Sequence, residues 1–320
     1  MTQTVAVHVL ARGIMFPSYA EGRLYSRHSS AVNISVADTP ELVSLITEPG
    51  DVTVSSILLS IVSGVRTLGA LPIPDRCDVS IQPRRIRFGW RVILELVRSP
   101  GEIRYDGRLD AAGQTGLTTG LDLVVPYLVS AICDSGPDRG FASIARALLD
   151  HGSGITTSRY ATSNCFAREA WRVLASSMHG LRSPAALHRL VGLGEGLTPS
   201  GDDFVTGALA AWTLIGAPPI PEAIRAQILA KTRETTRAGA TIVRQAVRGS
   251  FPAYVTRFAA EIRAVSDAGS AGCIEGVEIA GRIAAAIDRA ADHGHTSGID
   301  AVTGFAFGLT AGRSRAIVLS

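Results

Sequence analysis

Two segments of this sequence carry the residue types that small-anion chemistry requires. Residues 192–203 read GLGEGLTPSGDD, and residues 294–300 read GHTSGID. Alternating glycines let backbone amides approach a ligand without interference from a Cβ atom, and hydroxyl side chains add further donors. Both segments are therefore candidates for an anion-binding surface. The structural alternative is a pair of loops that only pack against the core.

The two segments also contain an internal repeat. Residues 200–207 read SGDDFVTG and residues 297–304 read SGIDAVTG, with identical residues at six of the eight positions. The pattern predicts a helix start in each copy, with a capping serine, a tightly turning glycine and a carboxylate that complements the free amides and the helix dipole. Helices are therefore expected over residues 201–213 and 298–310. Two such helix starts that face one cleft would bind an anion.

Three side chains in these segments are candidate catalytic residues. The hydroxyls of Thr198 and Thr296 can donate hydrogen bonds to a substrate oxygen, and His295 can transfer a proton or polarise a carbonyl group. Each of the three lies directly beside a predicted helix start.

A larger set of residues is predicted to bind the substrate anions. Arg237 follows two threonines, and Arg244 and Arg248 follow it at helical spacing. A guanidinium suits bidentate recognition of a carboxylate, although solvated arginines are the common alternative. The predicted anion-binding residues are Gly194, Glu195, Gly196, Ser200, Gly201, Asp202, Asp203, Arg237, Ser297, Gly298 and Asp300.

The adjacent carboxylates Asp202 and Asp203 leave a further interpretation open. One of them could leave the helix start and hold Mg²⁺ together with substrate oxygens, because this hard cation prefers oxygen ligands. No cofactor is certain from the sequence, and Mg²⁺ is the possible one. The sequence lacks the P-loop, the His-Glu-x-x-His motif, the dinucleotide-binding fingerprint and a nucleophile elbow, which removes the main support for those enzyme classes.

The elements that position these loops belong to an α+β protein. Up to about residue 110, short β-favouring runs alternate with turn residues, which predicts a mostly antiparallel β domain over residues 1–115. Beyond it, Ala- and Leu-rich stretches with helical spacing predict a larger α-helical domain over residues 116–320 that carries both loops. Small residues on several helix faces would let helix axes approach closely.

Composition excludes several kinds of partner. The chain has 46% hydrophobic and 18% charged residues and a net charge of +3, with no basic run that would neutralise successive phosphates of a nucleic acid. Its four cysteines form no zinc-binding or disulfide pattern. The apolar stretch at the N-terminus is too short for a secretory core, so we expect a cytoplasmic protein that contacts neither nucleic acid nor membrane.

The two signatures closely resemble those of the AllH-type subunit family of oxamate carbamoyltransferase. Members of that family carry a Gly-Leu-Gly-x-Gly-Leu-Thr-Pro-Ser-Gly-Asp-Asp segment like residues 192–203, and a second signature like residues 294–300. The resemblance covers mainly residues 190 to 310. The β domain is similar to the family only in general character.

This resemblance implies a multi-component transferase of purine and allantoin nitrogen catabolism. The reaction would convert oxalurate and phosphate into oxamate and carbamoyl phosphate, and the chain would act only with partner subunits. Two alternatives remain open: carbamoyl or carboxyl transfer on a different small acid, and a non-catalytic scaffold subunit that binds a metabolite and activates its partners.

Overall fold

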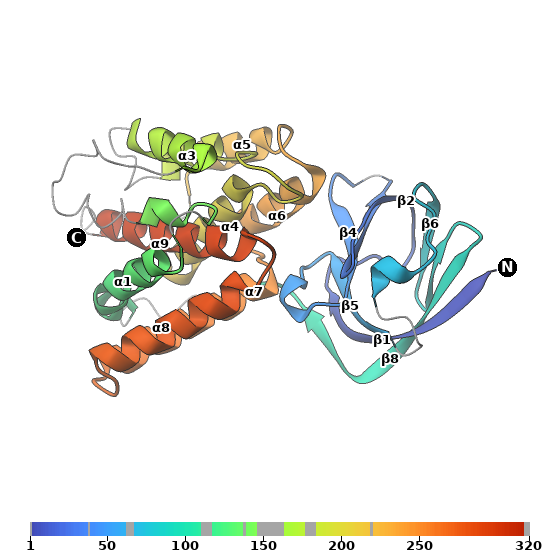
Figure 1. Ribbon diagram of the computed structural model, residues 1–320, viewed down its shortest axis with the longest axis horizontal. Coiled ribbons are helices and arrows are strands. Elements are labelled where there is room, and N and C mark those ends of the chain that lie inside the picture. The colour runs from blue at the N-terminus through green and yellow to red at the C-terminus, as the bar shows by residue number, and fades with distance from the viewer. Residues whose placement is uncertain are drawn as a thin grey trace. The chain divides into compact units, whose positions relative to one another are not determined.

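The computed structural model describes residues 2–37, 39–61, 67–109, 117–136, 139–145, 163–176, 184–217 and 220–316. The chain divides into two units, Met1–Gly107 and Arg108–Ser320. The described strands all belong to the first unit and the α-helices to the second, which confirms the predicted α+β class. The expected domain boundary at residues 115 and 116 lies outside the described residues (Figure 1).

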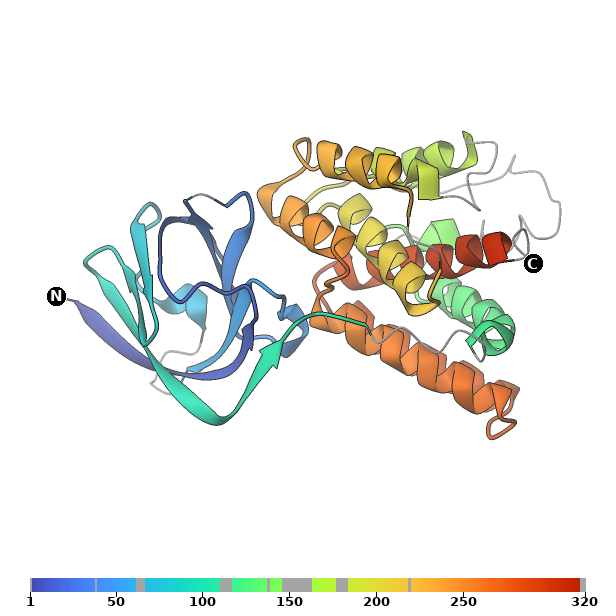
Figure 2. The same cartoon turned by 180° about the vertical axis from the view of Figure 1, so that it is seen from behind.

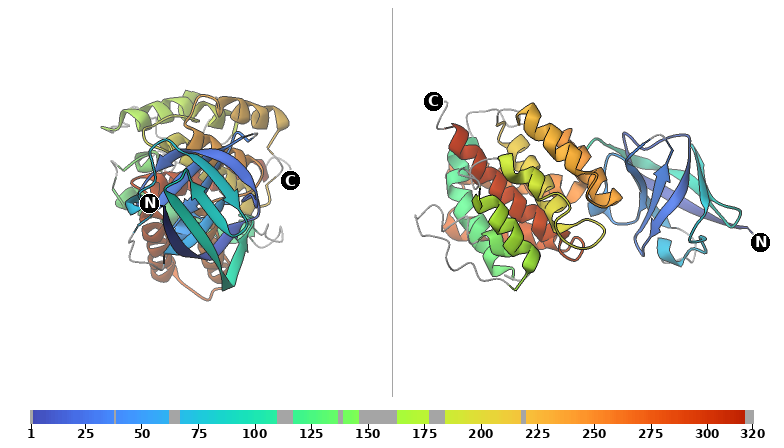
Figure 3. Two further views of the ribbon diagram at one scale, coloured as in Figure 1. Left: turned by 90° about the vertical axis from the view of Figure 1, so that its right-hand side faces the viewer. Right: turned by 90° about the horizontal axis from the view of Figure 1, so that it is seen from above.

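The first unit is a closed β-barrel (Figure 3, left). Its strands follow one another around the barrel in the order β1-β5-β4-β3-β2-β6-β7-β8. The β1–β8 and β4–β5 pairs are parallel and all other pairs are antiparallel, which confirms a mostly antiparallel domain. The strands are β1 Gln3–Gly13, β2 Ala20–Arg27, β3 Ala31–Val36, β4 Leu42–Ile46, β5 Ser56–Ile61, β6 Asp78–Gln82, β7 Arg85–Phe88 and β8 Val92–Tyr105.

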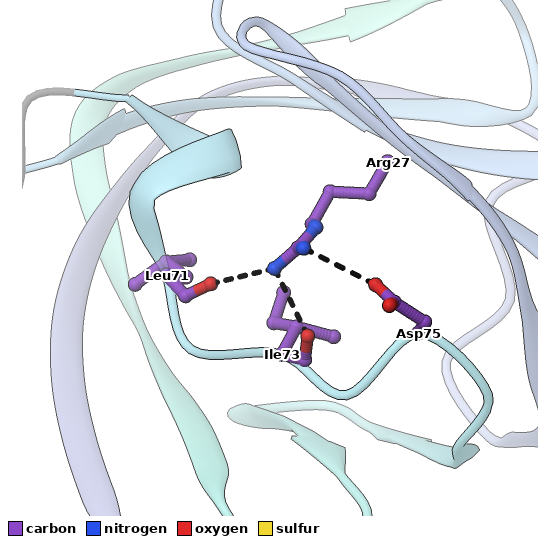
Figure 4. A network of polar contacts seen from close by, with 4 residues as sticks. All are labelled: Arg27, Leu71, Ile73 and Asp75. Atoms are coloured by element: carbon purple, nitrogen blue, oxygen red, sulfur yellow. Dashed lines mark hydrogen bonds and ion pairs between the residues drawn. The ribbon is translucent and has the colours of Figure 1, made fainter.

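The barrel is filled by alternating apolar side chains, as in β1, where every second residue from Val5 is buried. Two short 3-10 helices, η1 (Pro49–Asp51) and η2 (Leu68–Ala70), interrupt the strand connections. Arg27, at the end of β2, holds the segment after η2 against the barrel (Figure 4). Its guanidinium donates hydrogen bonds to the carbonyl oxygens of Leu71 and Ile73 at 2.9 Å and pairs with Asp75.

The second unit is a helical bundle (Figures 1 and 2). Its helices are α1 Leu117–Asp134, α3 Cys165–Ser176, α4 Ser200–Leu214, α5 Glu222–Lys231, α6 Arg237–Val247, α7 Ala253–Ser270, α8 Gly276–Ala291 and α9 Ser297–Ala316, with the 3-10 helix η4 at Pro184–Arg189. These bounds confirm the helices expected over residues 201–213 and 298–310, at the two copies of the repeat. Among the described residues, no helix is both long enough and apolar enough to span a membrane.

The centre of the bundle is the pair α4 and α9, which lie side by side (Figure 2). Every residue of α4 except Thr213 is buried. A Cβ atom on Gly207 of α4 would overlap the carbonyl oxygen of Ala301, and one on Gly304 of α9 would overlap that of Phe204. The repeat's last glycine in each helix therefore lets the two backbones touch, and the contact is reciprocal.

Candidate functional site

The two copies of the repeat form the first turns of α4 and α9. Each helix begins at the repeat's serine, so the prediction that these serines are the helix caps is wrong. Pro199 precedes α4 and makes no side-chain cap hydrogen bond. Each serine instead bonds to the carboxylate of the other helix, Ser200 to Asp300 and Ser297 to Asp203. The helix starts are cross-connected through their side chains.

The loops before the two helices meet at the same place. The hydroxyl oxygens of Thr198 and Ser297 lie 3.0 Å apart. Thr198 also hydrogen-bonds Asp203, and Thr296 makes the corresponding bond to Asp300. Both predicted loops and both helix starts therefore converge, as the repeat indicates.

The two shared carboxylates are deeply buried at this junction. Asp203 is 1% exposed and Asp300 is 0% exposed. Burial, followed by the nearby charge of Asp300, raises the pKa of Asp203 well above its usual range. Burial raises the pKa of Asp300 to about 6, against the hydrogen bond that the Phe141 N–H donates to its Oδ1 at 2.6 Å.

Each of these carboxylates has one oxygen without a hydrogen-bond partner among the described residues. The Oδ1 atom of Asp203 accepts a long 3.4 Å bond from the hydroxyl of Tyr254, and its Oδ2 atom accepts none. The Oδ2 atom of Asp300 is likewise without a donor. Buried polar atoms in folded proteins are nearly always hydrogen-bonded, so the two oxygens need a physical explanation.

Asp202, next to Asp203, has a different role. Its Oδ1 atom accepts the Gly192 N–H at 2.8 Å, and its Oδ2 atom accepts the Thr235 hydroxyl at 2.5 Å. Both oxygens are therefore satisfied, although burial still raises the pKa of this carboxyl to about 6. Asp202 fastens the glycine loop to the segment before α6.

The glycine loop presents its backbone to solvent. Gly192, Gly194 and Gly196 have φ angles of +81°, +128° and +92°, in the region that glycine adopts without strain. A Cβ atom on Gly194 would lie 2.6 Å from the backbone nitrogen of Ser200, whereas one on Gly196 would meet nothing within 4 Å. Glu195 and Gly196 are exposed. The loop tip is therefore open to a ligand.

The helix-start amides are less available than the sequence suggests. The Gly201 N–H donates to the carbonyl of Leu193 at 2.7 Å, and the Gly298 N–H donates to that of His293 at 3.0 Å. These two amides are used inside the chain. Ligand contact falls instead to the exposed loop tip and to the side chains around it.

Helix α6 contributes the predicted arginine. Thr236 caps α6 by accepting the Gly239 N–H at 2.9 Å, and its hydroxyl donates to the Leu197 carbonyl at 2.5 Å. Arg237, the first residue of α6, is half-buried beside this contact with the glycine loop. Arg244 and Arg248 lie at the other end of α6.

The second loop carries one exposed and one stacked imidazole. His295 is exposed, directly before the half-buried Thr296. The ring of His293 stacks on Tyr254, with centroids 4.0 Å apart and an interplanar angle of 15°. Sequence reasoning missed Tyr254, His293 and Phe141, because none lies in the repeat and two of them come from other elements. The adjacent glycine and histidine of the second loop could have drawn attention to His293.

In the part of the chain that the structure describes, no group of three or more His, Cys, Asp or Glu side chains is arranged to hold a metal ion. The junction instead combines two carboxylates with four hydroxyl groups, from Ser200, Ser297, Thr198 and Thr296. This is an oxygen-only set.

Comparison with known families gives a match over part of the chain. Residues 190–309 match the family model described as oxamate carbamoyltransferase subunit AllH. The match begins just before the glycine loop and ends within α9, so it contains both signatures and confirms the resemblance seen in the sequence. No curated protein and no solved structure matched the chain.

Proposed function

We propose that this chain, whose AllH-matching region holds both loops, is a subunit of a carbamoyltransferase that acts with other subunits on oxalurate and phosphate. In the forward direction a phosphate oxygen attacks the carbamoyl carbon of oxalurate. The bond from that carbon to the oxamate nitrogen breaks, and the nitrogen takes up a proton. Carbamoyl phosphate and oxamate are the products.

This reaction requires a cradle for phosphate, donors for the developing oxyanion, a cation for the oxamate carboxylate and a proton donor. We assign phosphate binding to the backbone of Gly194, Glu195 and Gly196, whose tip is exposed. Arg237 is assigned to the carboxylate because a guanidinium can bind it through two parallel hydrogen bonds.

The remaining roles fall to the second loop and its neighbour. His295 is exposed and is assigned to protonation of the leaving nitrogen. Thr198 and Thr296 are assigned to the oxyanion or to holding its donors. Both hydroxyls also hydrogen-bond the buried carboxyl groups, Thr198 that of Asp203 and Thr296 that of Asp300. Through these bonds the two threonines position the loops.

One observation carries the proposal: the 3.0 Å contact between the hydroxyls of Thr198 and Ser297. It joins the two signatures, which are 99 residues apart in sequence at this contact. A single small substrate can therefore touch residues of both.

The test is a reconstitution with partner subunits, in which each component is omitted in turn. His295→Ala should lower the rate of oxamate release by at least about 100-fold, the usual size of a general-acid contribution. His188→Ala, which changes a half-buried histidine on η4, is the matched control and should leave the rate unchanged.

Ligand protection of the chain gives a second measure. Phosphate or carbamoyl phosphate should raise the unfolding temperature of the wild-type complex, and Gly196→Val should remove this shift because the branched side chain occupies the open tip. Full activity of the partners without this chain, or equal activity of the His295 and His188 variants, would contradict the assignment.

A further inference from the structure

The junction of α4 and α9 contains two buried carboxyl groups that the described residues leave incompletely hydrogen-bonded, although the positive charge of Arg139 acts on Asp300. The side chains of Asp203 and Asp300 are excluded from solvent, and each leaves its Oδ2 atom without a donor. A carboxylate in such a place normally receives several hydrogen bonds or faces a cation, because removing it from water is costly.

The helix dipoles do not satisfy these oxygens. Both carboxylates lie in first turns, where positive helix ends favour negative charge. However, the Asp203 and Asp300 backbone N–H groups already donate to Pro199 and Thr296 carbonyls. The amides of Gly201 and Gly298 are also taken, as described above. The helix ends therefore contribute a favourable electrostatic field, but they donate no hydrogen bond to the two oxygens.

Asp202 shows what a carboxylate held for structure alone looks like in this chain. It is as buried as its neighbour, yet both of its oxygens accept short hydrogen bonds. The same turn of α4 thus contains one satisfied and one unsatisfied carboxylate. The difference points to a group that is bound by Asp203 and not by Asp202.

We propose that Asp203 and Asp300 together bind one divalent cation of the Mg²⁺ class between the first turns of α4 and α9. Each carboxylate contributes its unpartnered oxygen, and the hydroxyl groups of Ser200, Ser297, Thr198 and Thr296 supply neutral oxygens around it. The cation balances both charges at once. It also completes the link between the two copies of the repeat.

The donor set selects the class of metal. Carboxylate and hydroxyl oxygens are ligands of hard cations, whereas zinc sites in proteins are dominated by imidazole and thiolate. The imidazole of His293 is stacked on Tyr254. Mg²⁺ commonly uses one or two carboxylates and leaves further positions to water or substrate oxygens, which fits two carboxylates.

This site goes beyond the proposed reaction, because the argument for it rests on the two carboxylates and does not depend on which acid is the substrate. Its test therefore uses binding and not turnover. The full-length chain is stripped with a chelator and titrated with Mn²⁺, and free Mn²⁺ is followed by its electron paramagnetic resonance signal. We expect one Mn²⁺ per chain, displaced by Mg²⁺, and a rise in unfolding temperature of several degrees with Mg²⁺ but not with NaCl of equal ionic strength.

Four variants locate the site. Asp203→Asn and Asp300→Asn should each weaken Mn²⁺ binding by at least tenfold and remove the thermal shift, while circular dichroism shows the helices intact. Asp202→Asn should keep the stoichiometry, because its oxygens are used for hydrogen bonds. Asp292→Asn, which changes an exposed carboxylate before α9, is the matched control.

Several outcomes would overturn the proposal. Absence of Mn²⁺ uptake by the wild-type chain would do so without any variant. Unchanged binding in the Asp203→Asn/Asp300→Asn double variant would place the metal elsewhere. The last outcome is that the wild-type chain binds no metal and is less stable than the double variant. This result would mean that the two carboxylates share a proton and not a cation.

Discussion

The starts of α4 and α9 are two versions of one structure, and one of the two positions at which they differ lies directly before the shared aspartate. In α4 this residue is Asp202, and in α9 it is Ile299; both are fully buried. Asp202 holds the glycine loop, whereas Ile299 belongs to the hydrophobic core. The shared positions build the cross-connected junction, and the residue before the shared aspartate decides whether a loop is fastened to it.

The first prediction tests whether the two copies are equivalent in packing. Gly207→Ala and Gly304→Ala should each destabilise the chain strongly, because the new Cβ atom overlaps a backbone carbonyl that cannot move aside. Overpacking typically costs about 1–3 kcal/mol and occasionally more, which outweighs the gain of up to ~1 kcal/mol in helix propensity. The free energy of unfolding in urea measures both.

Gly281→Ala is the control for this pair. Gly281 lies on the exposed face of α8 with nothing within 4 Å of an added Cβ atom, so this change should stabilise by about 0.5–1 kcal/mol. Unequal losses for Gly207 and Gly304 would mean that only one copy supports the helix contact.

The second prediction concerns pH in the chelator-treated chain. The pKa values of Asp202 and Asp300 are raised to about 6 and that of Asp203 further, against about 3.9 in an unfolded chain. A raised pKa gives stability that is complete below the unfolded value and is lost as pH rises through the folded value. The free energy of unfolding should therefore fall between about pH 4 and pH 7.

The size of this fall is about 2–3 kcal/mol for each of the two groups near 6, by the conversion of about 1.36 kcal/mol per unit. The two copies should contribute unequally, because the first contains two titrating carboxyl groups, Asp202 and Asp203, and the second contains one, Asp300. Asp300→Asn should flatten the denaturation profile less than the Asp202→Asn/Asp203→Asn double variant. A profile that rises over this range would show that the carboxylates are stabilised as anions.

The third prediction compares Asp202 with Ile299, the residues directly before the shared aspartates. Asp202→Ala leaves the Gly192 N–H and the Thr235 hydroxyl without their acceptor, which should cost about 1–3 kcal/mol. Ile299→Val, at the equivalent position of α9, should cost about 0.5–1.5 kcal/mol by removing one buried methylene group. Proteolysis of residues 192–198 should increase only in the Asp202 variant.

The fourth prediction concerns the crossed serines. Ser200→Ala and Ser297→Ala each remove one hydrogen bond to a carboxyl group, worth about 0.5–1.5 kcal/mol while that group is protonated and about 1.5–3 kcal/mol while it is charged. Ser297 also contacts Thr198, so its loss should be the larger of the two. Thermal unfolding at pH 5 and pH 8 measures both; a greater loss for Ser200 would argue against the link between the loops.

Local pattern was sufficient to predict the helix starts, their convergence and the α+β class. The repeat matches at six of eight positions, and hydrophobic spacing marks the long helices. The capping role of the serines was predicted wrongly. The sequence pattern of a serine at a helix start is the same whether its hydroxyl bonds to its own helix or to a neighbouring one.

Tertiary partners were beyond the reach of local pattern. Tyr254 and Phe141 reach the carboxylates from distant segments, and no periodicity reports such a contact. In the barrel, the β-favouring runs over residues 5–10, 32–36, 52–61, 77–82 and 90–97 overlap five strands, but no run covers β2, β4 or β7. Strand β2 is partly exposed on both faces and β7 has only four residues, so neither gives a strong alternating signal. The parallel closure of β1 on β8 is likewise a property of the whole chain.

The crossing of each serine to the other helix has a kinetic consequence. Neither helix start is complete until a segment 99 residues away has arrived, so the junction forms only after a long loop has closed around α5, α6, α7 and α8. Contacts of such sequence separation form late and slow the folding of the unit that depends on them. During synthesis the first loop leaves the ribosome long before its partner. Until α9 follows, the backbone surface at Gly207 of α4 and the carboxyl group of Asp203 lack the segment that they contact in the folded unit.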